Sequence, residues 1–233
     1  MKFAIASICL TFSALTADGA SISIKNPSFE DQGDTLNGNG NGTPIASDPG
    51  DFTAGVVPEW DDNFTLTNNA GLFNPTGSTS GAAHSGSLVT FLQTNVNGGS
   101  YLVQNLELDG GGNVTAEPLS NITITGWISN RFSSAADPLL RVSLRVAPNT
   151  NIMAPMEFDA PNDPTWTEFT ASFDLPDSAT LGVAAGQPVF LVFDSIGPQI
   201  LLDDISGTTS IPEPSSALIC GCAGLLLLRR RRS

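Results

Sequence analysis

The sequence is short of cysteine and histidine. Its three cysteines, Cys9, Cys220 and Cys222, lie near the two ends of the 233-residue chain, and His84 is the single histidine. Zinc and haem sites are built largely from these two residue types, so the composition argues against either kind of site in the body of the chain. A secreted body without cysteine must be held together by its hydrophobic core, by a bound metal ion or by both.

Basic residues are also scarce. The chain has 23 acidic and nine basic residues, of which two acids and five bases lie in the terminal segments. Residues 21–210 therefore carry 21 acids and a formal net charge of −17, with four bases, Lys25, Arg131, Arg141 and Arg145. Such a surface repels the phosphates of nucleic acids and anionic lipids, so the sequence predicts no nucleic-acid partner. The same charge attracts divalent cations.

Residues 1–20 predict a secretory signal peptide. Lys2 is followed by an apolar run, residues 3–15, and then by small residues at Ala17 and Ala20. The run is too short to span a bilayer, and the pattern allows cleavage after Ala17 or after Ala20. We therefore expect the protein to be exported through the inner membrane.

The C-terminal sequence, IPEPSSALICGCAGLLLLRRRRS, combines three features. Pro212, Glu213 and Pro214 keep the chain extended, because proline cannot continue a helix. Residues 215–228 carry no charge, and a transmembrane helix of this length spans roughly 21 Å of the ~30 Å hydrocarbon core. The arginines that follow are expected to hold the cytoplasmic end of the helix as a membrane stop: Arg229, Arg230, Arg231 and Arg232.

Together these features resemble the PEP-CTERM sorting signal of Gram-negative biofilm-forming bacteria, here at residues 208–233. The resemblance implies that an exosortase-type enzyme cuts the membrane-anchored chain near the Pro-Glu-Pro motif and passes it to the cell surface or extracellular matrix. A permanent membrane anchor is the alternative, although it has no use for that motif.

The body of the chain predicts an all-β fold. Short apolar or alternating runs are separated by clusters of Gly, Asn, Asp, Pro and Ser, and no run has the spacing of an amphipathic helix. This pattern favours a two-sheet antiparallel β-sandwich, most simply a jelly roll. Residues 31–87, rich in Gly and Asn, are expected to form surface loops. Eight strands are expected, at residues 21–25, 87–93, 100–108, 121–129, 139–146, 166–175, 188–194 and 199–206.

The order of several segments in residues 21–207 resembles the galactose-binding-like jelly roll of carbohydrate-binding modules and bacterial surface proteins. The segments are KNPSFE (25–30), VVPEW (56–60), GGSYLVQNLEL (98–108), ITGWISNR (124–131), WTEFTASFDLP (166–176) and VFLVFDS with ILLDDIS (189–206). The resemblance implies a non-catalytic carbohydrate-binding module with a polysaccharide as its partner. A structural surface protein without a specific ligand is the alternative.

In this family the first and last strands lie close together and often share a structural calcium ion, which needs six to eight oxygen ligands. The resemblance implies that the ligands are Glu30, at the end of NPSFE, and Asp203, with Asp204 beside it in LLDDIS. The alternative is that all three are ordinary solvated acids in a loop and at a strand edge.

Carbohydrate recognition usually needs an exposed aromatic ring, on which the apolar face of a sugar stacks. Trp60 is the candidate, because the neighbouring Asp61 and Asp62 can accept hydrogen bonds from sugar hydroxyls. Trp127 and Trp166 lie in the expected strands and are predicted to be core residues.

No catalytic constellation is evident in the sequence. His84 lies in a Ser- and Gly-rich stretch and is expected to be a solvent-exposed loop residue, because a nucleophile and base need a third, orienting group. Neighbouring acids such as Asp61 and Asp62 point apart, whereas a glycosidase needs two carboxyl groups that face each other across a cleft. The sequence therefore predicts that the protein is not an enzyme.

Overall fold

The computed structural model describes residues 20–31, 49–53, 57–60, 70–76, 81–94, 101–118, 120–131, 138–146 and 150–210. Several predicted features lie outside these residues: the signal peptide, Asp61 and Asp62, the motif Pro212, Glu213 and Pro214, and the arginines 229–232. Within the described ranges, no helix combines the length and the apolar character that crossing a membrane requires.

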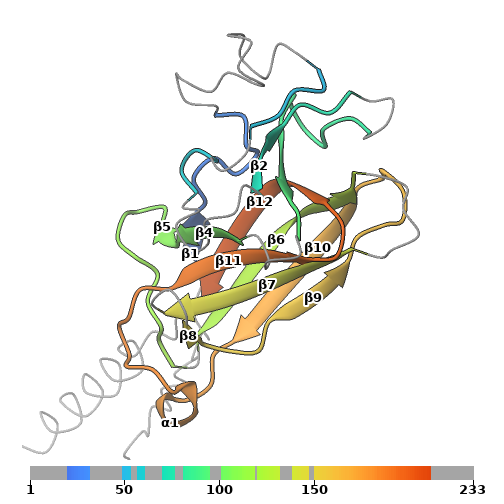
Figure 1. Ribbon diagram of the computed structural model, residues 1–233. Helices are drawn as coiled ribbons and strands as arrows, with labels where there is room; N and C mark the ends of the chain where they lie inside the picture. The colour runs from blue at the N-terminus through green and yellow to red at the C-terminus, as the bar shows by residue number, and fades with distance from the viewer. Residues whose placement is uncertain are drawn as a thin grey trace, which may run out of the picture. The chain divides into compact units, whose positions relative to one another are not determined.

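The described chain forms two antiparallel β-sheets, and Figure 1 shows β11 and β7 of one sheet in front of β12 and β6 of the other. The first sheet has seven strands: β1 (Ala20–Ser23), β2 (Ala70–Phe73), β3 (Val89–Leu92), β5 (Glu107–Leu108), β6 (Asn121–Asn130), β10 (Thr167–Asp174) and β12 (Ile200–Ser210). The second has five: β4 (Tyr101–Asn105), β7 (Leu139–Val146), β8 (Thr150–Asn151), β9 (Met156–Asp159) and β11 (Phe190–Ile196). One short helix, α1 (Ser178–Leu181), lies between β10 and β11. The fold is thus the predicted all-β, two-sheet sandwich of the jelly-roll kind.

Alternation of side chains along the strands builds the core between the sheets. In β10, Phe169, Ala171 and Phe173 are buried, and the residues between them are exposed. The adjacent strand β6 of the same sheet buries every second residue from Ile122 to Ile128, with Gly126 paired to Phe169. A β-carbon on Gly126 would lie 2.5 Å from Ile205 Cδ1 and 2.9 Å from Phe169 Cε1, so a larger residue here would force these core side chains to move.

The expectation that residues 31–87 form only surface loops is wrong. All four residues of β2 are buried, and β2 pairs with β3 along its whole length. Val57 and Trp60, in a short described turn before β2, also belong to the main core. The sequence did not predict these short apolar segments within the Gly- and Asn-rich stretch, because none of them is long enough to show the two-residue alternation of a strand. The strands β8 and β9 were likewise not expected, and β12 extends to Ser210, three residues beyond the predicted end of the domain.

Along one of its edges, β12 pairs with two different strands, β3 and β1, and a gap separates these two strands. β12 pairs with β3 through Ile200–Leu202 and with β1 through Gly207–Thr209. Between these two stretches, on its other edge, the pairing of β12 with β6 contains a β-bulge at Asp203–Ser206. The first and last strands are therefore adjacent, as the family resemblance implies, and the gap between β3 and β1 lies beside the two aspartates.

Candidate functional site

A row of polar side chains crosses four strands on the outer face of the five-stranded sheet. Tyr101 in β4 is paired with Asp194 in β11, and Asp194 is paired with Arg141 in β7. Arg141 is in turn paired with Glu157 in β9. Directly paired residues have their side chains on the same face, so these four side chains form one row. The alternate residues of β7, such as Leu140, face the core.

The carboxyl group of Asp194 is buried within this polar row, with 8% of its side chain exposed. Burial raises the pKa of Asp194 to about 6, although the positive charges of Arg141 and Arg145 act to lower it. The Oδ1 atom has no hydrogen-bond partner among the described residues. Buried polar atoms are rarely left unpaired, and an acid with a strongly shifted pKa is typical of a functional site.

Two of the four basic residues of the body lie beside this carboxyl group. Arg141 Nη1 is 3.6 Å from Asp194 Oδ2, and Arg141 also donates to Glu157 Oε1, from Nη2 at 2.8 Å and from Nε at 3.2 Å. The Arg145 guanidinium lies over the ring of Tyr101, 5.2 Å from the ring centroid. Two of the four bases of the body therefore lie on this face of the sheet, together with the acids Asp194 and Glu157.

This arrangement has the parts of a general acid. Near pH 6 the Asp194 carboxyl group exists in both protonation states, so it can both hold and release a proton close to neutral pH. The carboxylate left after proton release is stabilised by the nearby Arg141 charge. Tyr101 and Arg145 place an aromatic ring and a cation beside the acid.

Glu30, a predicted calcium ligand, instead holds the segment that leads into β3. Its Oε1 atom accepts hydrogen bonds from the backbone N–H groups of Ser87, at 2.8 Å, and Leu88, at 2.7 Å. Gly86, with φ of +58°, lies against the same carboxylate, and a β-carbon there would be 2.2 Å from Glu30 Oε1. The close contact and the left-handed backbone both require glycine at this position.

The other two predicted calcium ligands hold the same segment from β12. Asp203 Oδ2 accepts a hydrogen bond from the backbone N–H of Ser85 at 3.0 Å, and the Ser85 hydroxyl donates to Asp204 Oδ1 at 2.7 Å. Consecutive residues of a regular strand point to opposite faces. Here the β-bulge and the positive φ of Asp204, 48°, turn both carboxylates toward Ser85.

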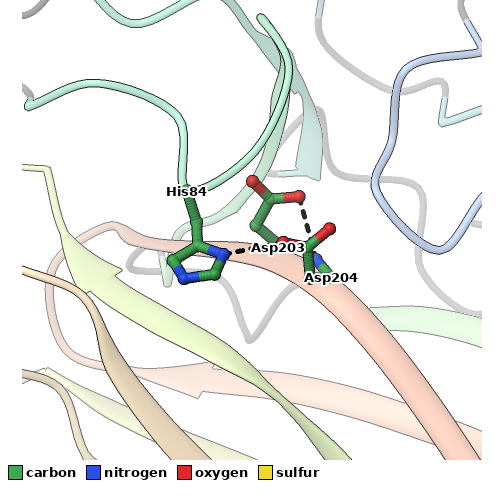
Figure 2. Close-up of side chains that lie close together, drawn as sticks. All are labelled: His84, Asp203 and Asp204. Carbon is green, nitrogen blue, oxygen red and sulfur yellow. Dashed lines mark hydrogen bonds and ion pairs between the residues drawn. The ribbon is translucent and has the colours of Figure 1, made fainter.

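His84 completes a cluster with these two aspartates (Figure 2). Its Nδ1 atom lies 2.7 Å from Asp204 Oδ2. The imidazole ring stacks on Trp127, with 4.0 Å between ring centroids and 18° between ring planes, and meets Trp166 at its edge. His84 is an exposed loop residue, as the sequence predicts, with 29% of its side chain exposed, but these contacts hold it in place. Trp127 is half-buried on the outer face of β6, and not in the core as the sequence predicts, whereas Trp166 is half-buried and packs against a second hydrophobic cluster that contains Phe73 and Phe91.

The cluster can hold a metal ion, because one donor atom from each of His84, Asp203 and Asp204 lies within 4.8 Å of the others. Two of the three predicted calcium ligands are therefore brought together, but Glu30 is not part of the group and His84 takes its place. Calcium prefers six to eight oxygen ligands, whereas this set supplies two carboxylates and an imidazole nitrogen. A calcium ion at this cluster would have to take its remaining oxygen ligands from the backbone or from water.

The predicted sugar-stacking residue Trp60 lies in the core. Its residue exposure is 5%, and its ring lies between Phe29 and Phe193, with centroid distances of 5.7 and 5.6 Å. The indole N–H donates to the backbone oxygen of Asn26 at 3.4 Å. Phe29 of the NPSFE turn and Phe193 thus cover the ring that stacking on a sugar would need.

Sequence reasoning missed Asp194 and His84. A signal for Asp194 was present, because it is a lone acid inside the apolar run VFLVFDS. Its arginine neighbours come from β7, about 50 residues earlier in the chain, and are revealed by strand pairing alone. His84 had no local signal, because its partners Asp203 and Asp204 are about 120 residues away.

Solved structures with this fold include cyclases. A Stig cyclase from Fischerella sp. TAU, in complex with (3Z)-3-(1-methyl-2-pyrrolidinylidene)-3H-indole, is 19% identical and matches 84% of this chain and 100% of its own, with a TM-score of 0.59. A cyclase from the same organism in complex with 4-(1H-indol-3-yl)butan-2-one is also 19% identical and matches 83% and 98%, with a TM-score of 0.56. A family 16 carbohydrate-binding module is 14% identical and matches 64% and 89%, with a TM-score of 0.39. No model of a known protein family and no curated protein matches the chain.

These likenesses overturn the prediction that the protein is not an enzyme. The prediction rested on a fold taken to be that of binding modules, yet cyclase chains share this fold over nearly their whole length. The prediction also considered only pairs of acids that are close together in the sequence. A single buried carboxyl group such as Asp194 becomes a candidate catalytic acid only through its neighbours in the sheet.

Proposed function

We propose that the protein is an enzyme that binds a small organic substrate over the outer face of the five-stranded sheet and uses Asp194 as a general acid. The observation that carries this proposal is the buried Asp194 carboxyl group, whose pKa is about 6 and whose Oδ1 atom has no hydrogen-bond partner among the described residues. The fold shared with the cyclases is consistent with it.

In the proposed reaction, the proton moves from the Asp194 carboxyl group to a basic atom or an electron-rich carbon of the bound substrate. Positive charge develops on the substrate while the carboxylate forms, and Arg141 stabilises that carboxylate from 3.6 Å. The carboxyl group is restored when it takes a proton from the product or from water. The Tyr101 ring and Arg145 form the wall against which an aromatic or unsaturated substrate would lie.

Indole in D₂O provides a test, because protonation at C3 followed by loss of the original hydrogen leaves deuterium on the ring. Indole ligands occur in the cyclase structures, which makes indole a reasonable first probe. We expect the protein to accelerate this exchange, and Asp194→Asn to reduce the acceleration by about 100-fold or more. Asp159→Asn, on the exposed side of β9, is the matched control and keeps the wild-type rate. Equal rates for the wild-type protein and Asp194→Asn contradict the proposal.

A second candidate function is an exported polysaccharide-binding protein of the cell surface or matrix. Carbohydrate-binding modules are among the solved structures with a similar fold, and the terminal segments resemble a signal peptide and a PEP-CTERM sorting signal. Saturable binding on a glycan array together with no probe exchange would favour this function over catalysis.

Export and processing have a separate test. If an exosortase-type enzyme cuts near Pro212, Glu213 and Pro214, mass spectrometry of the surface form will show a chain without the four terminal arginines. A surface form that still carries Arg229–Arg232 contradicts processing and leaves the permanent anchor.

A further inference from the structure

We propose that His84, Asp203 and Asp204 form a binding site for a borderline divalent metal ion such as Zn²⁺, and that the site prefers this class of ion to Ca²⁺. The cluster lies by the β-bulge of the seven-stranded sheet, whereas Asp194 belongs to the five-stranded sheet. The inference therefore does not depend on the function proposed for Asp194.

The geometry suits a small ion. Zinc binds histidine nitrogen and carboxylate oxygen at roughly 2.0–2.2 Å, so two ligands of a tetrahedral ion are separated by about 3.4 Å. The His84 Nδ1 and Asp204 Oδ2 atoms are 2.7 Å apart and must open by less than about 1 Å, which a small side-chain rotation allows. His84 and Asp204 each expose close to 30% of their side chains, so an ion can enter from solvent.

The charges of the cluster call for a cation. Asp203 is completely buried, and its carboxylate lies within 4.8 Å of donor atoms of both Asp204 and His84. Two adjacent carboxylates, one of them out of water, are destabilising without a counter-charge. A divalent ion offsets both.

The identity of the donors selects the class of ion. Imidazole suits Zn²⁺, Cu²⁺, Ni²⁺ and Co²⁺, whereas Ca²⁺ and Mg²⁺ prefer oxygen. Three protein ligands with one nitrogen leave a fourth position for water, as in many zinc sites. The sequence argued against zinc because it has one histidine and no cysteine in the body, but two carboxylates brought to that histidine by the bulge supply the missing ligands.

The carboxylates are also held in place by other groups. Asp203 accepts hydrogen bonds from the backbone N–H groups of Ser85, at 3.0 Å, and Asp204, at 2.9 Å. Asp204 Oδ1 accepts from the Ser85 hydroxyl. Such outer contacts orient the ligands and leave little side-chain freedom to lose when an ion binds.

The test is a titration of the full chain with Co²⁺, Zn²⁺ and Ca²⁺. Co²⁺ at the site quenches tryptophan fluorescence, because the ring of Trp127 stacks on His84, and its visible absorption bands report nitrogen and oxygen ligation. Zn²⁺ displaces Co²⁺ and restores the fluorescence. At a hundredfold excess over its Kd, Zn²⁺ raises Tm by about 5–10 °C. Ca²⁺ at the same concentration leaves both signals unchanged.

His84→Gln is the diagnostic variant, since it removes the imidazole from a partly exposed position. We expect it to lose the quenching and to bind Zn²⁺ about 100-fold more weakly, which separates this site from any binding at the three cysteines of the chain. Glu168→Gln, at the position paired with Trp127 but outside the cluster, is the control and keeps wild-type affinity.

Three results overturn the inference. The first is that Co²⁺ gives no signal and Zn²⁺ does not shift the Tm of the wild-type protein. The second is that Ca²⁺ stabilises the protein as well as Zn²⁺ does. The third is that His84→Gln binds Zn²⁺ with wild-type affinity. If His84→Gln does not fold, the Co²⁺ absorption spectrum of the wild-type protein serves as the test. Bands typical of oxygen ligands alone would contradict a site that includes the His84 imidazole nitrogen.

Discussion

Replacing Asp194 with asparagine should change how the stability of the protein depends on pH. The pKa of Asp194 is about 6 in the folded protein and 3.8 for an unburied aspartate, a difference of about two units. Each unit corresponds to about 1.36 kcal/mol, so burying the ionised group costs about 3 kcal/mol in total. Since 8% of the side chain is exposed, solvent screening reduces this figure little.

The sign follows from proton binding. The folded state holds the Asp194 proton more tightly than the unfolded state does, so Asp194 favours folding most at low pH, and this contribution is lost as the pH rises from about 4 through about 6. About half of the loss, roughly 1.5 kcal/mol, falls between pH 5 and pH 8. This range avoids the isoelectric point near 4.1, where solubility is lowest. The free energy of unfolding of Asp194→Asn, relative to that of the wild-type protein, should therefore rise by about 1.5 kcal/mol from pH 5 to pH 8.

Urea unfolding followed by tryptophan fluorescence, at several pH values from 5 to 8, measures this difference. All other acids, including Asp203, are present in both proteins, so their contributions to the pH dependence cancel in the difference between the two free energies of unfolding. Asp159→Asn, at an exposed position of β9, controls for the loss of one negative charge from an acidic protein. The contrary result is a difference in free energy of unfolding between Asp194→Asn and wild type that stays constant within about 0.5 kcal/mol over this range. That result would refute the claim that burial raises the pKa of Asp194.

Three further predictions concern the core and the segment before β3. Phe193→Ala should lower the free energy of unfolding by about 3–5 kcal/mol, because Phe193 is fully buried between Trp60 and Phe169, and urea unfolding measures it. Gly86→Ala should lower Tm in a thermal melt, because its β-carbon would press on Glu30 and its φ is +58°; an unchanged Tm would contradict the described turn. Glu30→Gln should speed amide hydrogen exchange at Ser87 and Leu88 by about tenfold, because a neutral amide oxygen accepts these bonds more weakly than a carboxylate; equal exchange rates would argue against the contact.

The sequence by itself determined the class of fold. Alternating runs such as NITITGWIS and TEFTASFD repeat with a period of two, and that period can bury one face only in a sheet. Seven of the eight expected strands appear within a few residues of their predicted positions, and the eighth, residues 100–108, is divided into β4 and β5. The order of motifs also placed the first strand beside the last. Local periodicity therefore carried the architecture.

The tertiary structure decided the sites. Asp203 and Asp204 would point apart in a regular strand, and the bulge that turns both toward Ser85 leaves no mark on a local pattern. The outward orientation of Trp127 follows from its neighbour Gly126, which faces the core against Phe169.

The two candidate sites join residues that are far apart in the chain. His84 meets Asp204 across about 120 positions, and Asp194 meets Arg141 across about 50. Periodicity specifies which face of a strand is buried, but strand pairing specifies which side chains become neighbours. The shifted pKa of Asp194 and the donor cluster at His84 are both consequences of that pairing, so they became visible only in the folded chain.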